Sequence, residues 1–149
     1  MSEATTRPVL LGIGEAATRA GVSERALRYY QQLGLITPSG ITPGGLRRYS
    51  EENLQRVARI RELQNLLGFN LDEIRDVLAS EDQLAELRRA YERADVVRQR
   101  QLVADSLVLQ EGLQTLVQAK RSALDHFLED VQARIARMRD WLADHPEGD

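Results

Sequence analysis

The chain contains no cysteine among its 149 residues. Disulfides, cysteine-ligated zinc sites, iron–sulfur clusters and thiolate metal sensors are therefore excluded. Aromatic residues are scarce at 5%, while hydrophobic residues reach 42%, so we expect a core of Leu, Val and Ile between packed helices. No apolar run approaches the ~20 residues of a membrane-spanning helix, and no signal-peptide pattern is present. These absences predict a cytoplasmic protein without a membrane partner.

Proline and glycine are nearly absent from the second half of the chain, where Gly112 is the only one between residues 69 and 145. The first half is rich in both. This contrast predicts a turn-rich domain followed by almost uninterrupted helix. We expect a flexible tail over 1–10, a folded head over 11–80, a helical segment over 81–143 and a second flexible tail over 144–149.

The net charge of −3 does not suggest nucleic acid, but its distribution does. Residues 19–61 hold three acids and eight arginines, a net charge of +5, which leaves −8 for the rest of the chain. A basic head on an acidic body is typical of proteins in which one part binds phosphate and the other avoids it. Because solvated charged faces are common, this asymmetry alone does not decide the function.

Two short helices are predicted near the start of the head. The first covers residues 13–20 and ends at Gly21, where a tight turn needs glycine. The second begins after Ser23 as N-cap and runs to about Leu33, with Gly34 just past its end. Two short helices joined by a glycine-containing turn are a helix-turn-helix.

The rest of the head alternates turn and helix signals. Residues 35–49, with Gly44-Gly45 at their centre, predict a small β-hairpin, the wing. Ser50 then caps a third helix with an apolar face, and Asn70 opens a fourth, with Glu73 at capping-box spacing. The expected apolar face of the third helix is Leu54, Val57, Ile60, Leu63 and Leu67, and that of the fourth is Ile74, Val77 and Leu78.

The strongest periodicity lies in the C-terminal half, where apolar residues recur at spacings of 4, 3, 4, 3 and 4. This is a heptad stripe, and a helix from about 106 to 143 would be roughly 55 Å long. Such a helix needs a partner, either a second chain or residues 83–104 folded back on it, and the two can coexist. The expected dimer interface is Val117, Leu124, Leu128, Val131, Ile135, Met138 and Leu142.

The head resembles the DNA-binding domain of MerR-family regulators over residues 11–80. The motifs appear in family order and include Ala20-Gly21-Val22-Ser23, Leu27-Arg28-Tyr29-Tyr30, Gly44-Gly45-Leu46-Arg47-Arg48-Tyr49-Ser50 and Leu67-Gly68-Phe69. The resemblance implies a mainly α fold with a winged helix-turn-helix head. It also implies a homodimer, held by an antiparallel coiled coil of long C-terminal helices, that binds a double-stranded promoter dyad and distorts it. RNA polymerase is then a candidate partner.

A recognition helix places its N-terminal half in the major groove. Arg25 and Arg28 lie three residues apart and share a face; the resemblance implies contacts to bases or phosphates from both and a phosphate contact from Tyr29. The alternatives without a DNA contact are a solvated surface for the arginines and core packing for Tyr29. Tyr30 is expected to pack inward. The full set of expected DNA-contacting residues is Ser23, Arg25, Ala26, Arg28, Tyr29, Arg47, Arg48 and Tyr49.

The wing departs from the family pattern. Leu46 stands where an aromatic residue is usual, and Gly40 and Ile41 occupy positions that often carry arginine. We therefore expect fewer phosphate contacts from the wing. Arginines of the third helix could compensate for them, namely Arg56, Arg59 and Arg61.

The sequence says little about an effector, and we expect no cofactor and no metal. His126 and Asp130 could in principle hold a metal, but a solvated helix face is the simpler interpretation. Phe127 and Trp141 could line a small apolar site between subunits, although packing is the default. The poorer periodicity of residues 88–104 suggests a bent or less rigid stretch.

Three functions compete. The first is a sequence-specific, promoter-binding transcription regulator. The second is a DNA-bending accessory or recombination factor with the same head, and the third is a coiled-coil adaptor. An enzyme is not expected, because there is no cysteine, no histidine beside a Ser/Asp constellation and no glycine-rich phosphate loop.

Overall fold

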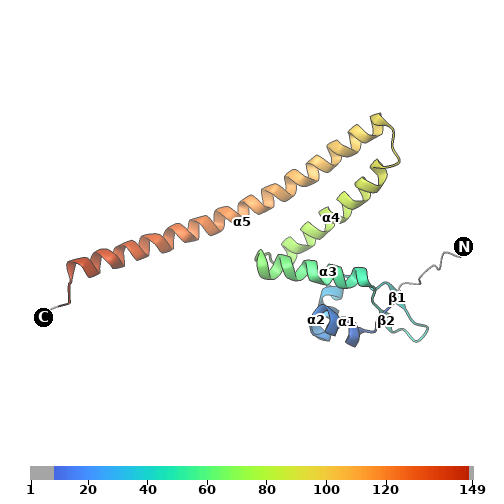
Figure 1. The fold of residues 1–149 in the computed structure, drawn as a ribbon, viewed down its shortest axis with the longest axis horizontal. Helices are drawn as coiled ribbons and strands as arrows, with labels where there is room; N and C mark the ends of the chain where they lie inside the picture. Colours follow the sequence, from blue (N-terminus) through green and yellow to red (C-terminus); the bar gives the residue numbers. More distant parts are fainter. Residues whose placement is uncertain (1–8, 148–149) are drawn as a thin grey trace, which may run out of the picture. The chain divides into compact units, whose positions relative to one another are not determined.

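The structure is a computed structural model that describes residues 9–147 (Figure 1). The chain divides into two compact units with the break between Ala79 and Ser80. Residues 1–8 of the first predicted tail and residues 148–149 of the second lie outside the described part. The elements are, in order, α1 (Ile13–Ala20), α2 (Glu24–Gln32), β1 (Gly40–Ile41), β2 (Arg47–Arg48), α3 (Glu51–Arg61), the π-helical turn η1 (Glu62–Leu66), α4 (Leu71–Tyr91) and α5 (Val96–Asp144).

The helix-turn-helix forms as predicted. Gly21 ends α1 in the left-handed region at φ 69°, which glycine adopts without steric cost. Ser23 then caps α2, its hydroxyl accepting a hydrogen bond from the backbone N–H of Ala26 at 3.0 Å. Gly34, at φ 73°, follows the end of α2. These local signals set the ends of both helices.

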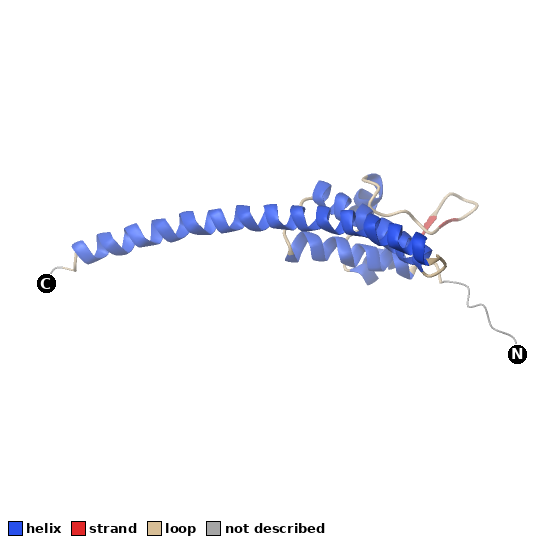
Figure 2. Cartoon of the chain, turned by 90° about the horizontal axis from the view of Figure 1, so that it is seen from above, coloured by secondary structure: helices blue, strands red, loops and turns tan. Residues whose placement is uncertain are grey.

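The wing is a short antiparallel hairpin in which Gly40 pairs with Arg48 and Ile41 with Arg47. Its turn is closed by a hydrogen bond from the Gly45 backbone N–H to the Thr42 carbonyl oxygen at 2.8 Å. An isolated antiparallel bridge between Leu11 and Tyr49 ties the base of the wing to the segment before α1. Figure 2 shows the strands within the wing, and the other regular elements of residues 9–147 are helices. The predicted mainly α fold class is confirmed.

The third helix differs from the prediction at its end. Ser50 and Asn53 form a capping box at its start, and Leu54, Val57, Ile60 and Leu63 are buried. The helix then widens into η1, whose i→i+5 pattern rotates the following residues out of the α-helical register. Leu67 is consequently 47% exposed, so its predicted place on the buried face is wrong.

The N-terminal unit has one apolar core between α1, α2, α3, the wing base and the first turns of α4. The capping box predicted at Asn70 and Glu73 is present, with reciprocal bonds of 2.9 Å, and it starts α4 so that its apolar side faces this core. The buried residues are Leu11, Ala16, Ala17, Leu27, Tyr30, Leu35, Ile36, Tyr49, Leu54, Val57, Ile60, Leu63, Phe69, Ile74, Val77 and Leu78.

In the second unit, the last turns of α4 and the start of α5 run side by side. The two helices are joined at residues 92–95, where Asp95 caps α5 by accepting from the Arg98 backbone N–H at 2.8 Å. The long helix thus begins at Val96, earlier than the predicted residue 106. Leu102, packed towards α4, is 2% exposed. Of the alternative fold-back over residues 83–104, only residues 83–91 pack back against the long helix, and residues 96–104 belong to that helix itself.

The heptad stripe remains uncovered within a single chain. Leu124, Met138 and Leu142 are 63%, 65% and 63% exposed. Val131 is half-buried, and Val117, Leu128 and Ile135 are also exposed. A 49-residue helix with such a stripe leaves a large apolar surface without a partner in its own chain.

Candidate nucleic-acid interface

The outer face of α2 presents the residues expected to face DNA. A hollow of about 570 Å³ on this face is lined by Ser23, Arg25, Ala26, Arg28, Tyr29 and Gln32. Tyr29 is 48% exposed, which rules out core packing for its side chain, whereas Tyr30 is buried as predicted. Five of the eight predicted site residues therefore share one accessible surface.

A single acid shares the exposed face of α2 with the two arginines. Glu24 accepts from Arg28 across one helical turn, with its Oε2 3.5 Å from Nη2. Both side chains are about half exposed, so the pair contributes little to stability. Glu24 instead holds the Arg28 guanidinium in one direction and offsets part of its charge.

A second hollow, of about 430 Å³, lies between α2, the wing and the start of α1. Its lining includes three arginines, Arg28, Arg47 and Arg48, together with glycine backbone and the exposed Leu46. Three guanidinium groups are thus gathered around a surface where glycine leaves the backbone accessible. Arg28 lines this hollow as well as the one on α2. The two hollows therefore form one continuous basic surface, which we call the basic face.

Tyr49 also lines the second hollow, but from beneath the accessible surface. It is fully buried, and its hydroxyl lies 2.7 Å from the side-chain amide of Gln31. The burial of the ring, which follows β2, argues against a contact between Tyr49 and the DNA backbone, and that contact stays a prediction. Burial raises the pKa of this phenol, although the charges of Arg47 and Arg28 act against the rise.

Gln31 connects the wing to α2, and sequence reasoning did not single it out. With its amide nitrogen donating to the Tyr49 hydroxyl at 2.7 Å, its oxygen accepts from Arg47 Nε at 2.8 Å and Nη1 at 2.7 Å. This chain of hydrogen bonds orients Arg47 on the basic face. No sequence pattern marks such a residue, because its partners come from a different element.

Asn53 holds the other side of the wing. Its side-chain nitrogen donates to the Thr37 carbonyl oxygen at 2.8 Å, and its oxygen accepts from the Ser50 backbone N–H at 3.0 Å and the Ser39 hydroxyl at 2.8 Å. Asn53 is itself buried at 7% exposure. The Ser50-x-x-Asn53 spacing was a visible signal for the cap, but not for the bond to Thr37.

The arginines of α3 form hydrogen bonds and an ion pair within the chain. Arg56 donates to the Leu35 carbonyl oxygen at 2.5 Å, and Arg61 to the Ala20 carbonyl oxygen at 3.3 Å. Arg59 forms an ion pair of 2.7 Å with Glu62. These contacts argue against the expected compensation of a weak wing by this helix.

The C-terminal half shows no metal arrangement within the described residues. His126 lies 3.9 Å from Glu129 on an exposed helix face, and residues 9–147 contain no group of three potential ligands. None of the helices in the described part combines the length and the apolar character that crossing a bilayer requires.

The geometry defines a winged helix-turn-helix domain with a basic face formed by its second helix and its wing. Comparison with known proteins agrees. Residues 11–81 match the model of the MerR HTH family regulatory protein. The chain therefore carries a MerR-family helix-turn-helix domain, which confirms the resemblance inferred from its motifs.

The relatives found by sequence share mainly this domain. The nodulation protein NolA of Bradyrhizobium elkanii is 43% identical over 91 residues, which cover 61% of this chain and 41% of NolA. The regulator YfmP of Bacillus subtilis is 32% identical, over 53% of this chain and 56% of YfmP. This chain thus spans about two fifths of the length of NolA and about half of YfmP.

A solved structure extends the likeness to the fold of most of the chain. HiNmlR, described as a MerR family regulator lacking the sensor domain and bound to promoter DNA, superposes with a TM-score of 0.52. The alignment covers 91% of this chain and 94% of that one at 21% identity, which supports a common fold.

Proposed function

We propose that the protein is a homodimeric, sequence-specific transcription regulator that binds a promoter dyad and distorts the DNA between its half-sites. Promoter DNA, a second copy and RNA polymerase are its proposed partners, and the cytoplasm is the proposed compartment. The observation that carries the proposal is the basic face, because exposed arginines from the recognition helix and the wing converge on it within a MerR-family domain.

Each residue of the basic face has a proposed role. Arg25 and Arg28 contact base edges or phosphates in the major groove, and Ala26 allows close approach of the helix. Tyr29 donates to a phosphate, while Arg47 and Arg48 contact the backbone beside it. Ser23 acts at the helix N-terminus, where backbone N–H groups favour an anion. Tyr49 is not among the proposed DNA contacts and instead supports Arg47 through Gln31.

The exposed heptad stripe of α5 supports the homodimer. Seven apolar positions from Val117 to Leu142 stay at least partly exposed in one chain, and two such stripes would cover each other in a coiled coil. A dimer also places two basic faces on one duplex, which a dyad requires.

Footprinting of the purified chain on genomic DNA fragments tests the proposal. The expected result is protection of a dyad within or beside a promoter. Protection and bending of a dyad outside promoters would favour an accessory recombination factor instead. If no sequence were preferred at low salt, the adaptor interpretation would replace the regulator.

Variants of the basic face sharpen the test. Arg28→Ala and Arg47→Ala should each weaken binding to the protected dyad, whereas Arg89→Ala, an exposed arginine on α4, should not. With 6–10 phosphate contacts per dimer, affinity should fall by ~10³–10⁵ between 50 and 200 mM salt. Wild-type affinity in both basic-face variants would overturn the site assignment.

A further inference from the structure

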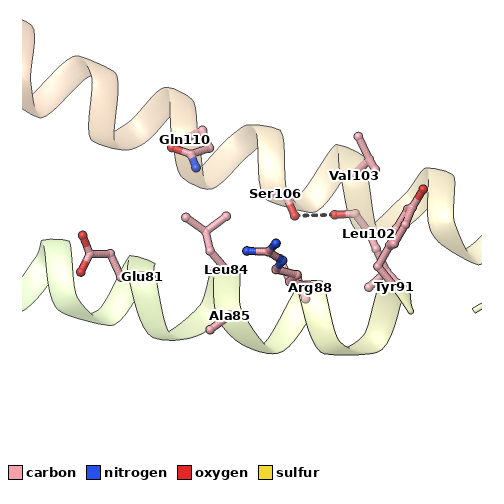
Figure 3. Close-up of a pocket in the computed structure, with 10 residues that line it drawn as sticks. Glu81, Leu84, Ala85, Arg88, Tyr91, Leu102, Val103, Ser106 and Gln110 are labelled. Carbon is pink, nitrogen blue, oxygen red and sulfur yellow. Dashed lines mark hydrogen bonds between the residues drawn. The ribbon is translucent and has the colours of Figure 1, made fainter. Parts of the chain in front are cut away.

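The second unit contains a groove that the proposed DNA-binding function does not use. It lies between the end of α4 and the start of α5 and has a volume of about 540 Å³. Leu84 and Tyr91 line it from α4, and Val103 and Ser106 line it from α5 (Figure 3). The Ser106 hydroxyl is turned back onto the Leu102 carbonyl oxygen at 2.8 Å, so this wall presents little polar surface.

The groove is continuous with the heptad stripe. Continued towards the N-terminus, the stripe passes through Val117, Gln110 and Val103, and the last two of these line the groove. Val103 is 56% exposed and Tyr91 42% exposed, which leaves apolar surface open beside the stripe. A helix that covered the stripe along its whole length would therefore also pass over the groove.

The length of the stripe selects a register for two antiparallel copies. The register that pairs the most positions places Leu142 of one copy level with Val103 of the other, and Met138 level with Leu107. It also places Leu128 level with Val117. A pairing centred further towards the C-terminus would leave Val103 and Leu107 uncovered.

The alternative register is centred between Glu129 and Asp130 and places Leu142 of one copy level with Val117 of the other. It covers the stripe from Val117 to Leu142 but leaves the groove without a partner.

In this register Trp141 reaches the groove. Trp141 and Ser106 occupy the same heptad position, on the flank beside Met138 and Val103, and antiparallel packing brings these flanks together. Trp141 is 60% exposed in one chain and is stacked on one side by His145, with ring centroids 4.3 Å apart. The other face of the indole remains open.

We propose, on the basis of the homodimer proposed above, that the groove between α4 and α5 receives Trp141 of a second copy. Leu84 and Tyr91 give the indole an apolar seat, and the guanidinium of Arg88 at the rim can lie against its ring. A buried aromatic anchor in a pocket is the kind of contact that concentrates binding energy in an interface. The site is incomplete without the second copy, and each dimer contains it twice.

Cysteine cross-linking in the full chain tests the register, because the natural sequence has no cysteine. The double variant Ser106→Cys/Trp141→Cys, oxidised with diamide, should give a covalent dimer on a non-reducing gel. The two positions lie about 50 Å apart within one helix, so they cannot react inside one chain. The double variant Lys120→Cys/Trp141→Cys reports the shifted register and should stay unlinked, as should each single variant.

Fluorescence tests occupation of the groove, since Trp141 is the only tryptophan. At concentrations where the chain is dimeric, its emission should be blue-shifted and weakly quenched by acrylamide. Leu84→Ala should shift the emission to the red and increase quenching. Val108→Ala, on the opposite side of the α4–α5 pair, should leave both unchanged.

The outcomes separate this proposal from the proposed function. A dimer in sedimentation that binds its dyad but cross-links only through Lys120→Cys/Trp141→Cys, or through neither double variant, would overturn the groove contact alone. Emission typical of an exposed indole in the dimer would do the same. A monomer at micromolar concentration without sequence preference would overturn both proposals.

Discussion

The hydroxyl of Tyr49 lies 2.7 Å from the side-chain amide of Gln31, which joins the end of the wing to the helix proposed to read DNA. The contact is only part-buried, and it sets the position of Arg47, which is exposed. We expect this pair to affect DNA binding by orienting Arg47 rather than by contacting the DNA itself.

Gln31→Ala should lower the free energy of unfolding by about 1 kcal/mol, the usual net worth of a hydrogen bond. It should also weaken DNA binding, because Arg47 loses the acceptor that orients it. Urea unfolding and gel shift measure the two effects. Gln55→Ala, on an exposed position of α3, is the control; equal losses in both variants would contradict the proposed link.

Tyr49→Phe should change the response of stability to alkaline pH. The pKa of Tyr49 is raised by burial in the folded chain, so above about pH 10 the unfolded chain loses this proton while the folded chain keeps it. Stability is thus unaffected by this group below that pH and falls as the pH rises through the folded pKa. Urea unfolding between pH 8 and pH 11 should show a smaller alkaline loss for the variant than for wild type. A parallel loss in both would refute the prediction.

Asn53→Ala should destabilise the head by about 1–3 kcal/mol, because it leaves the Thr37 carbonyl oxygen and the backbone N–H of Ser50 without their side-chain partner. Asn53→Asp keeps the cap acceptor but removes the donor to Thr37, so it should lose less. Thermal unfolding followed by circular dichroism compares the three proteins. The order would have to be reversed, or the three midpoints equal, to contradict this role.

Gly21→Ala should cost about 1–2 kcal/mol, since an L side chain is strained in the left-handed region. The new Cβ would also lie 2.9 Å from Arg61 Nη1, which would have to shift. Gly112 is a matched control, because nothing lies within 4 Å of a Cβ there and alanine favours a helix interior. Gly112→Ala should therefore stabilise the chain. Relative to wild type, the unfolding midpoint should fall for Gly21→Ala and rise for Gly112→Ala.

Glu24→Gln should strengthen binding to the proposed dyad. The change removes the acid that pairs with Arg28 at 3.5 Å and leaves that guanidinium's charge unopposed on the basic face. Gel shifts over a salt series should show higher affinity at every salt concentration. Glu86→Gln, an exposed acid on α4, is the control, and an equal gain there would mean that only net charge matters.

The sequence predicted most of what local chemistry determines. Ser23, Ser50, Gly21 and Gly34 mark helix ends through their own backbone and side-chain bonds, and the structure places them at those ends. The heptad stripe likewise predicted a long helix. Its start at Val96 was missed, because Asp95 caps it in a stretch with poor apolar periodicity.

What the sequence did not predict depends on contacts between distant segments. Tyr49 matches a motif expected at DNA, but whether its ring points outward depends on the pairing of β2 and on Leu11. Leu67 fits the apolar period of α3, but η1 changes the period before it is reached. Nothing in the sequence distinguishes Arg56 and Arg61 from arginines that bind DNA. Only the structure shows that they donate to backbone carbonyl groups of the protein.

The wing is fastened at its base on three sides, by the bridge to Leu11, the amide of Gln31 and the side chain of Asn53. It therefore cannot slide along α2 without breaking buried bonds. The fold therefore fixes the spacing between the arginines of the two elements. Where this spacing differs from that of the phosphates in undistorted DNA, we expect the DNA to deform rather than the protein.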